Sequence, residues 1–232
     1  MHSTGGNNLP NRISNTNIIG NSSGDYAGGI HLRTNSNTNI EGCLIDSNSS
    51  AVAGGIYIDV STAEITNSTI SNNIASTPSS DGYGGGIYGN NANINLNNID
   101  IDNNNSDHGG GIYANNSIVT IDSVDFLNNI SEFGGGILVD HSETSIEISH
   151  STFTNNEADI GGGILVYGYA SIEVVSSLFD NNLSAVAGGI YLNNSQPAIV
   201  SNCTFVSHTN TGDDDTDAAA IHVGANDITI IN

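Results

Sequence analysis

Short runs of alternating apolar and polar residues recur along the chain at regular intervals. The stretch Phe126–Val139, FLNNISEFGGGILV, contains the three recurring features: a large apolar residue, an asparagine three positions later, and a Gly-Gly-Ile landmark. The landmarks end at Ile30, Ile56, Ile87, Ile112, Ile137, Ile164 and Ile190, with a degenerate copy at Ile221. Neighbouring landmarks are 25–31 residues apart. A period of this size predicts a solenoid.

Each period contains three short segments with strand-like alternation, at residues 136–139, 146–148 and 152–154 in one copy. Alternation predicts that Ile137, Val139, Ile146, Ile148 and Phe153 face inward, and that Leu138, Glu147 and Thr154 face outward. Helical runs of ten or more residues are missing from the pattern. We therefore predict an all-β right-handed parallel β-helix with three short strands per coil and about eight coils of 25–31 residues.

The pattern also predicts the domain organisation. Residues 1–17 are polar and unpatterned, which predicts a loose lead-in, and residues 18–232 form a single β-helix domain. Two coils are longer than the rest, which predicts insertion loops near residues 74–83 and 208–217. Neither end shows a capping segment, so we expect self-association head to tail, or neighbouring coils of a longer chain.

Two rows of recurring residues have structural roles in this interpretation. An asparagine recurs at one corner of each coil, which predicts a ladder of stacked amides that satisfies buried backbone groups. Its members are Asn73, Asn104, Asn129, Asn156 and Asn182. Phenylalanine recurs at equivalent inward positions of three successive coils, which predicts a row of stacked rings in the core. Its members are Phe126, Phe153 and Phe179. The glycine two positions before the landmark isoleucine (Gly135, Gly162, Gly188) is expected to face inward and leave room for these rings.

Charge is strongly one-sided. Twenty-four acidic residues stand against Arg12 and Arg33, with no lysine, and the net charge is −22. Such a surface repels nucleic acid and anionic lipid head groups, so nucleic acid is excluded as a partner. No apolar run reaches 18 residues, which excludes insertion of a helix into a membrane.

The repeated blocks FLNN, FTNN and FDNN, together with Gly-Gly-x-Ile or Gly-Gly-x-Leu, resemble the repeats of the chlamydial polymorphic membrane proteins. They are also similar to bacterial and archaeal surface β-helix adhesins. The resemblance covers about residues 18–223 and implies a passenger-like segment for adhesion or surface structure. It departs from the family in having GGGI and AGGI, where the family tends to have alanine.

An enzyme on the same scaffold is the alternative, either a polysaccharide lyase or a glycosidase. A lyase of acidic sugars uses basic residues to neutralise the substrate carboxylate, and this chain has only two arginines. A glycosidase needs two carboxylates converging on one face, and the dense acidic group is confined to one insertion loop. We therefore expect no catalysis.

That acidic loop is a candidate metal site. Asp213, Asp215 and Asp217 offer oxygen ligands at alternate positions, which suits Ca²⁺ as a possible cofactor. The loop lacks the downstream glutamate and the glycine of an EF-hand. The competing interpretation is a solvated acidic loop.

A row of residues directly after the landmark isoleucines is the candidate ligand or partner face. It contains His31, Tyr57, Tyr88, Tyr113, Leu138, Leu165, Tyr191 and His222. Beside it runs a row of glycines expected to face outward, Gly55, Gly86, Gly111, Gly136, Gly163 and Gly189. An exposed aromatic stripe is suited to stacking on a glycan or packing on a host-surface ligand. Alternatively, the tyrosines stack on each other for stability alone.

The sequence as a whole predicts a non-catalytic extracellular or cell-surface module that is adhesin-like or structural, with fibre formation as one structural role. A carbohydrate-active enzyme or a carbohydrate-binding module on the same fold is the alternative.

Overall fold

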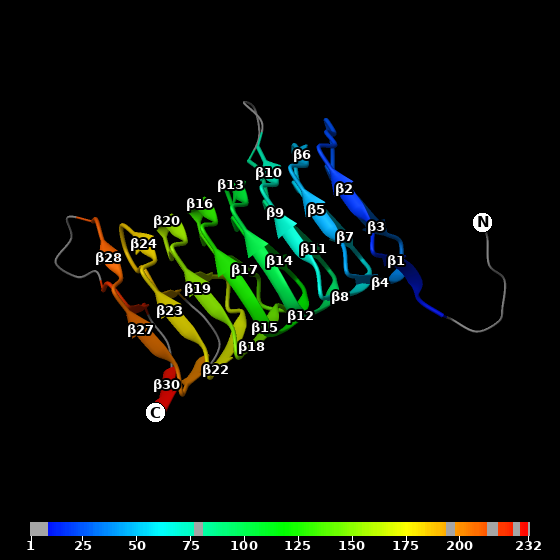
Figure 1. Ribbon diagram of the computed structural model, residues 1–232. Coiled ribbons are helices and arrows are strands. Elements are labelled where there is room, and N and C mark those ends of the chain that lie inside the picture. Colours follow the sequence, from blue (N-terminus) through cyan, green and yellow to red (C-terminus); the bar gives the residue numbers. More distant parts are fainter. Residues whose placement is uncertain (1–8, 77–80, 194–197, 213–217, 225–227, 232) are drawn as a thin grey trace.

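The computed structural model describes residues 9–76, 81–193, 198–212, 218–224 and 228–231. Successive coils stack along one axis, with β1 (Asn11–Ser14) and β30 (Ile228–Ile231) at opposite ends of the stack (Figure 1). All strands of this described part pair in parallel, and they form three sheets that run the length of the stack.

The sheet that carries the landmark isoleucines has eight strands, and we call it the tyrosine sheet. Its strands are β3 (Ile30–Arg33), β7 (Ile56–Asp59), β11 (Ile87–Asn90), β14 (Ile112–Asn115), β17 (Ile137–Asp140), β21 (Ile164–Val166), β25 (Ile190–Leu192) and β29 (Ile221–Val223). Landmark isoleucines pair with each other from coil to coil, as Ile112 does with Ile137.

The second sheet has fifteen strands, and we call it the long sheet. Its main path is β1 (Asn11–Ser14), β4 (Asn37–Glu41), β8 (Thr62–Thr66), β12 (Asn93–Asp102), β15 (Ile118–Leu127), β18 (Ser145–Ser149), β22 (Ser171–Val175), β26 (Ala198–Ser201) and β30 (Ile228–Ile231). Beside it lie β2 (Asn17–Ile19), β5 (Leu44–Asp46), β9 (Thr69–Ser71), β19 (Thr152–Thr154), β23 (Leu178–Asp180) and β27 (Thr204–Val206). The two paths are one sheet because β12 and β15 continue through the bend between them.

The third sheet has seven very short strands, and we call it the short sheet. It consists of β6 (Ser49–Ser50), β10 (Ile74–Ala75), β13 (Asn105–Ser106), β16 (Ile130–Phe133), β20 (Glu157–Ile160), β24 (Leu183–Ser184) and β28 (Thr209–Asn210). These strands follow the corner asparagines. The sequence pattern did not predict them as strands, because their inward residues are alanine and serine.

The predicted fold is confirmed as an all-β parallel solenoid of about eight coils with three sheets. The predicted faces are also found for Ile137, Ile148 and Phe153, which are buried in one continuous core, and for Glu147, which is exposed. One boundary differs: residues 11–14, expected in the lead-in, form β1 and pair with β4. Alternation was too weak there to reveal a strand whose outer residues are polar.

Left-handed residues turn the chain at the corners. In the Asn-Asn pairs, the first asparagine adopts positive φ, as in Asn128 (55°), Asn155 (54°) and Asn181 (52°). Asparagine tolerates this conformation better than most side chains do. The second asparagine of each pair then points into the coil. The pair thus supplies both a turn and a buried amide.

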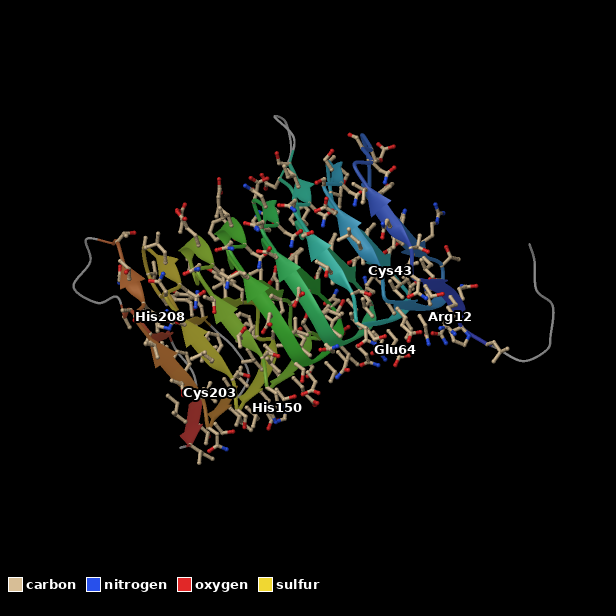
Figure 2. The ribbon with its side chains drawn as sticks, viewed as in Figure 1. Arg12, Cys43, Glu64, His150, Cys203 and His208 are labelled. Carbon is tan, nitrogen blue, oxygen red and sulfur yellow. The ribbon has the colours of Figure 1, made fainter. Side chains whose placement is uncertain are left out.

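Cys43 and Cys203 are free. They lie in coils toward opposite ends of the stack (Figure 2). Each lies two residues before the large apolar residue of its coil, Ile45 or Phe205, so the two cysteines occupy equivalent positions in distant coils.

Candidate functional site

The predicted structural asparagines lie in one buried row. Asn73, Asn104, Asn129, Asn156 and Asn182 are fully buried. The Nδ2 of each of the first four donates to the Oδ1 of the next, with N···O distances of 3.0–3.1 Å. Each Nδ2 also donates to a backbone carbonyl of the preceding coil, as Asn156 does to Phe126 at 3.0 Å. The row therefore satisfies backbone groups that the corner would otherwise leave unpaired.

The predicted phenylalanines stack inside the core. The rings of Phe126, Phe153 and Phe179 are nearly parallel, with 4.6 Å between neighbouring centroids. The glycines that make room for them are Gly136 and Gly163. A Cβ on Gly136 would lie 3.0 Å from a ring carbon of Phe153, and one on Gly163 would lie 3.1 Å from Phe179.

The sequence prediction for the glycines was therefore wrong in both rows. A Cβ on Gly135 would meet backbone oxygen of the next coil at 2.5 Å, so that glycine permits close backbone approach. The predicted outward placement of Gly136 and Gly163 is also wrong, since a Cβ on either would point at a phenylalanine ring in the core. The left-handed turn at Gly134, with φ of 67°, interrupts the strict alternation on which the prediction relied.

The expected open stripe is wrong for five of its eight members, which are buried. Tyr57, Tyr88 and Tyr113 point away from the main core, but their exposed fractions are only 6–9%. They belong to a second apolar cluster, which also contains Leu138 and Leu165. Burial is the main cause that raises the pKa of Tyr57 to about 12, and it raises the pKa of Tyr88 and Tyr113 as well.

A second row of side chains covers these tyrosines. It comes from the residues directly before the glycine turn, and it includes Tyr83, His108 and Phe133 in successive coils. The ring of Tyr83 lies 5.7 Å from Tyr88 and 5.3 Å from Tyr113. The sequence pattern treated this segment as a plain connection, so it could not predict that the tyrosines would be covered.

The remaining three members of the candidate face, His31, Tyr191 and His222, are partly exposed. His31 stacks on Tyr57 with 4.8 Å between centroids, and Tyr191 stacks on His222 at the same distance. His31, Tyr191 and His222 thus continue the row toward both ends of the stack. A role of this row in binding a ligand or partner stays a prediction.

A pocket of about 220 Å³ opens where the row of rings is interrupted. Its floor is Leu138 and Leu165, its walls are Phe133 and Ile160, and His108, Asp140 and Tyr167 complete the lining. Asp140 ends β17, and its carboxylate accepts a hydrogen bond from the Tyr113 hydroxyl at 3.3 Å. Pattern reasoning missed the pocket, because its floor and its walls come from parts of the coil on opposite sides of the glycine turn.

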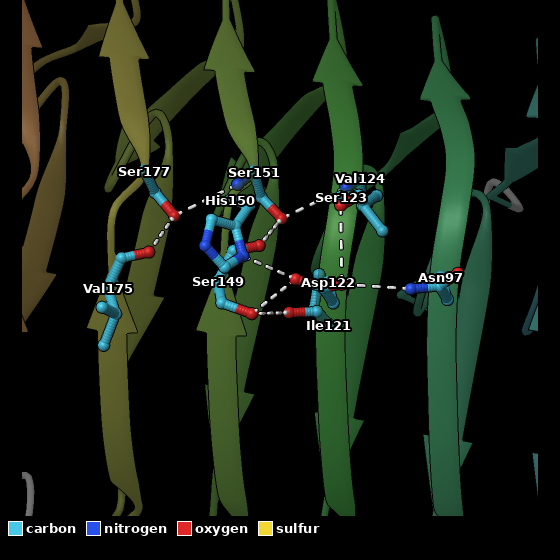
Figure 3. A network of polar contacts seen from close by, with 10 residues as sticks. All are labelled: Asn97, Ile121, Asp122, Ser123, Val124, Ser149, His150, Ser151, Val175 and Ser177. Carbon is cyan, nitrogen blue, oxygen red and sulfur yellow. Dashed lines mark hydrogen bonds and ion pairs between the residues drawn. The ribbon is translucent and has the colours of Figure 1, made fainter.

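A separate polar network centres on Asp122, at the bend of the long sheet (Figure 3). Its Oδ1 contacts His150 Nδ1 at 2.8 Å and accepts a hydrogen bond from Ser149 Oγ at 2.8 Å, while Asn97 Nδ2 donates to Oδ2 at 3.1 Å. Hydrogen bonds from His150 and then Ser149 lower the pKa of Asp122.

Those contacts do not form the relay of a serine hydrolase. In such a relay the imidazole stands between the hydroxyl and the carboxylate. Here the carboxylate stands between the other two groups. The network instead ties neighbouring coils together, since Asp122 pairs in register with Ser149 of the next coil.

The predicted calcium loop, Asp213, Asp215 and Asp217, lies outside the described residues. Among the residues that are described, no group of three or more His, Cys, Asp or Glu is arranged to hold a metal ion. That same part of the chain contains no helix long and apolar enough to cross a membrane.

Three parallel sheets with side-chain ladders running from coil to coil define a parallel β-solenoid. The chain belongs to the family described as the right-handed β-helix region, whose model matches residues 2–179. Searches of curated proteins and of solved structures found no match.

Proposed function

We propose that the protein is a non-catalytic extracellular or cell-surface β-helix module, adhesin-like or structural. The main support for this proposal is the row of outward-facing side chains at the centre of the long sheet. It is exposed in six consecutive coils, at Glu64, Asn95, Thr120, Glu147, Glu173 and Ile199. These residues pair in register from coil to coil, as Glu147 does with Glu173.

Buried ladders hold this face in place from the inside. The asparagine row and the phenylalanine stack fix each coil against the next, so the outward side chains recur at about one strand spacing, roughly 4.8 Å. A periodic face of this kind supports adhesion, because weak contacts repeated along one rod reinforce each other. It equally supports lateral packing in a surface layer or fibre.

Composition supports the location. With no lysine, and with Arg12 and Arg33 as the two arginines, the chain offers two cleavage sites to proteases that cut after basic residues. The net charge of −22 favours solubility, because molecules with the same large charge repel each other. The proposal includes the predicted partners: further coils, or a second copy stacked head to tail by parallel strand pairing.

The test combines location with adhesion. Antibodies against the purified chain should label intact cells of the source organism, and labelling that requires permeabilised cells would contradict the proposal. Beads coated with the chain should adhere to a panel of intact cells or, if the role is structural, the chain should form filaments visible by electron microscopy.

A matched pair of variants assigns the adhesive face. Glu147→Lys with Glu173→Lys reverses two charges on the long sheet and should reduce adhesion. Glu132→Lys with Glu157→Lys makes the same charge change at exposed positions of the short sheet and should leave adhesion intact. Release of reducing ends from polysaccharides by the purified chain would favour the enzyme alternative.

A further inference from the structure

The interrupted row of rings points to a ligand. In the coils before the interruption, rings fill the space between the tyrosine sheet and the covering row, and Tyr83 lies 5.3 Å from Tyr113. The next two residues in register with Tyr113 are Leu138 and Leu165, and Tyr191 follows them. Leucine lacks the reach of a tyrosine ring. The space that rings fill elsewhere is therefore left as the pocket.

One part of the pocket lining is aliphatic and aromatic. Its floor, Leu138 and Leu165, is buried and purely aliphatic. Phe133 lines one side and is held by stacking on His108, with 5.2 Å between centroids and 13° between the planes. Tyr167 lines another part and is 45% exposed, so its ring is available to a ligand.

Polar groups complete the lining. The carboxylate of Asp140 is fixed by the backbone N–H of His141, which donates to Oδ1 at 2.7 Å, and by the Tyr113 hydroxyl. His141 Nδ1 also lies 3.2 Å from Oδ2, whereas Oδ1 keeps a lone pair with which Asp140 can accept a hydrogen bond from a ligand. His108 Nε2 lies 3.6 Å from the Asp81 carboxylate.

We propose that this pocket binds one neutral pyranose ring of a glycan, an inference that rests on the proposed non-catalytic binding role. A pyranose presents C–H groups on its faces, which suit Phe133 and the leucine floor, and hydroxyls at its rim, which suit Asp140. The volume of about 220 Å³ is below the roughly 300–1,000 Å³ of sites for drug-sized ligands, so it suits a single ring. Carboxylated or sulfated sugars are disfavoured by Asp140 and by the net charge.

Methyl-group NMR provides a direct measurement. Methyl glycosides of glucose, galactose, mannose and N-acetylglucosamine are titrated into the full chain, labelled at the leucine methyls. At least one should shift the Leu138 and Leu165 signals saturably, with a Kd in the millimolar range expected for a small, partly exposed ring. Galacturonate and N-acetyltyrosinamide are titrated in parallel as an anionic sugar and an aromatic rival.

Variants that refill or reshape the pocket make the test specific. Leu138→Tyr restores the residue found at Tyr57, Tyr88 and Tyr113, and should abolish the shift of Leu165. Leu9→Tyr makes the same substitution at an exposed residue that does not line the pocket, and should leave binding unchanged. Asp140→Asn should weaken binding about tenfold, the effect of losing one charge-assisted hydrogen bond. Phe133→Leu should also weaken binding, and it provides a second test of the pocket if Leu138→Tyr fails to fold.

Several results would overturn the proposal. These are the absence of saturable shifts with every neutral glycoside, tighter binding of galacturonate or N-acetyltyrosinamide, or unchanged binding in folded Leu138→Tyr. Cleavage of nitrophenyl glycosides would support the pocket and contradict the non-catalytic role. Saturable sugar binding by a chain that antibodies do not find on intact cells would support the pocket and contradict the surface location.

Discussion

Each Asn-Asn pair divides two tasks between neighbouring residues. Asn155 supplies a left-handed corner on the surface, while Asn156 supplies a buried amide one position later. The amide of Asn156 accepts from Asn129 and donates both to Asn182 and to the carbonyl of Phe126. A single side chain thus serves three coils.

Replacing Asn156 by alanine should be costly. The change leaves the backbone N–H and side chain of Asn129, the carbonyl of Phe126 and the amide of Asn182 without this partner inside the protein. Each unsatisfied buried group costs about 1–3 kcal/mol, so we expect a loss of at least about 3 kcal/mol in the free energy of unfolding. Chemical denaturation followed by circular dichroism measures it.

Asn155→Ala is the matched control, because it removes the same carboxamide from the adjacent, exposed residue. It should cost about 1 kcal/mol, the penalty of a left-handed alanine. Equal losses in the two variants would show that the buried ladder contributes no more than the turn.

The sequence predicted these residues well because their spacing is tied to the coil. Asn129, Asn156 and Asn182 follow Phe126, Phe153 and Phe179 at a constant distance. The tyrosine row was predicted less well. The buried isoleucines next to the tyrosines were evident from alternation. The tyrosines are covered, however, by Tyr83 and the residues in register with it, and these belong to a segment without a repeated apolar pattern.

At the scale of the elements, the long sheet and the tyrosine sheet are predictable, and the short sheet is not. Inward residues of the short sheet, such as Ala75, Ser106 and Ala158, are small and buried. Alanine and serine there take the place of the larger residues that make alternation visible. A pattern search based on hydrophobicity therefore stops at the corner asparagine.

The phenylalanine stack tests the strand faces. Phe153→Ala removes a fully buried ring that lies between Phe126 and Phe179, and should cost about 3–5 kcal/mol. Glu147→Ala alters an exposed residue of the preceding strand and should change stability by less than about 0.5 kcal/mol. Denaturation midpoints give both values, and similar midpoints for the two variants would contradict the assigned faces.

The whole molecule is a stack whose ladders must end somewhere. The asparagine row passes from Asn182 to His208, which stands in the place of the next asparagine, near the C-terminal end of the stack (Figure 2). The backbone N–H of Asn182 donates to His208 Nδ1 at 3.2 Å, so this nitrogen must be an unprotonated acceptor. Burial lowers the pKa of His208 from 6.5, and the nearby Asp180 opposes that shift.

Stability of the C-terminal coils should therefore depend on pH. Because the pKa of His208 is lower in the folded chain than in the unfolded chain, its contribution is present above the unfolded value of 6.5 and is lost as pH falls through the folded value. His208→Asn should remove this component. Hydrogen exchange of residues 204–210 between about pH 8 and pH 5, with both chains compared at each pH, measures the difference. Parallel pH profiles in the two chains would contradict the prediction.

Each coil pairs with its immediate neighbours through equivalent residues, so the length of this protein is adjustable in whole coils. Deleting residues 137–163 would join Gly136 to Ile164, bringing Leu165 against Tyr113, Phe179 against Phe126 and Asn182 against Asn129. The shortened chain should fold and be shorter by one strand spacing, roughly 4.8 Å. A deletion of half a coil would put polar residues into the core. Genetic gain or loss of single repeats can therefore change the reach of the rod in fixed steps without new packing having to evolve.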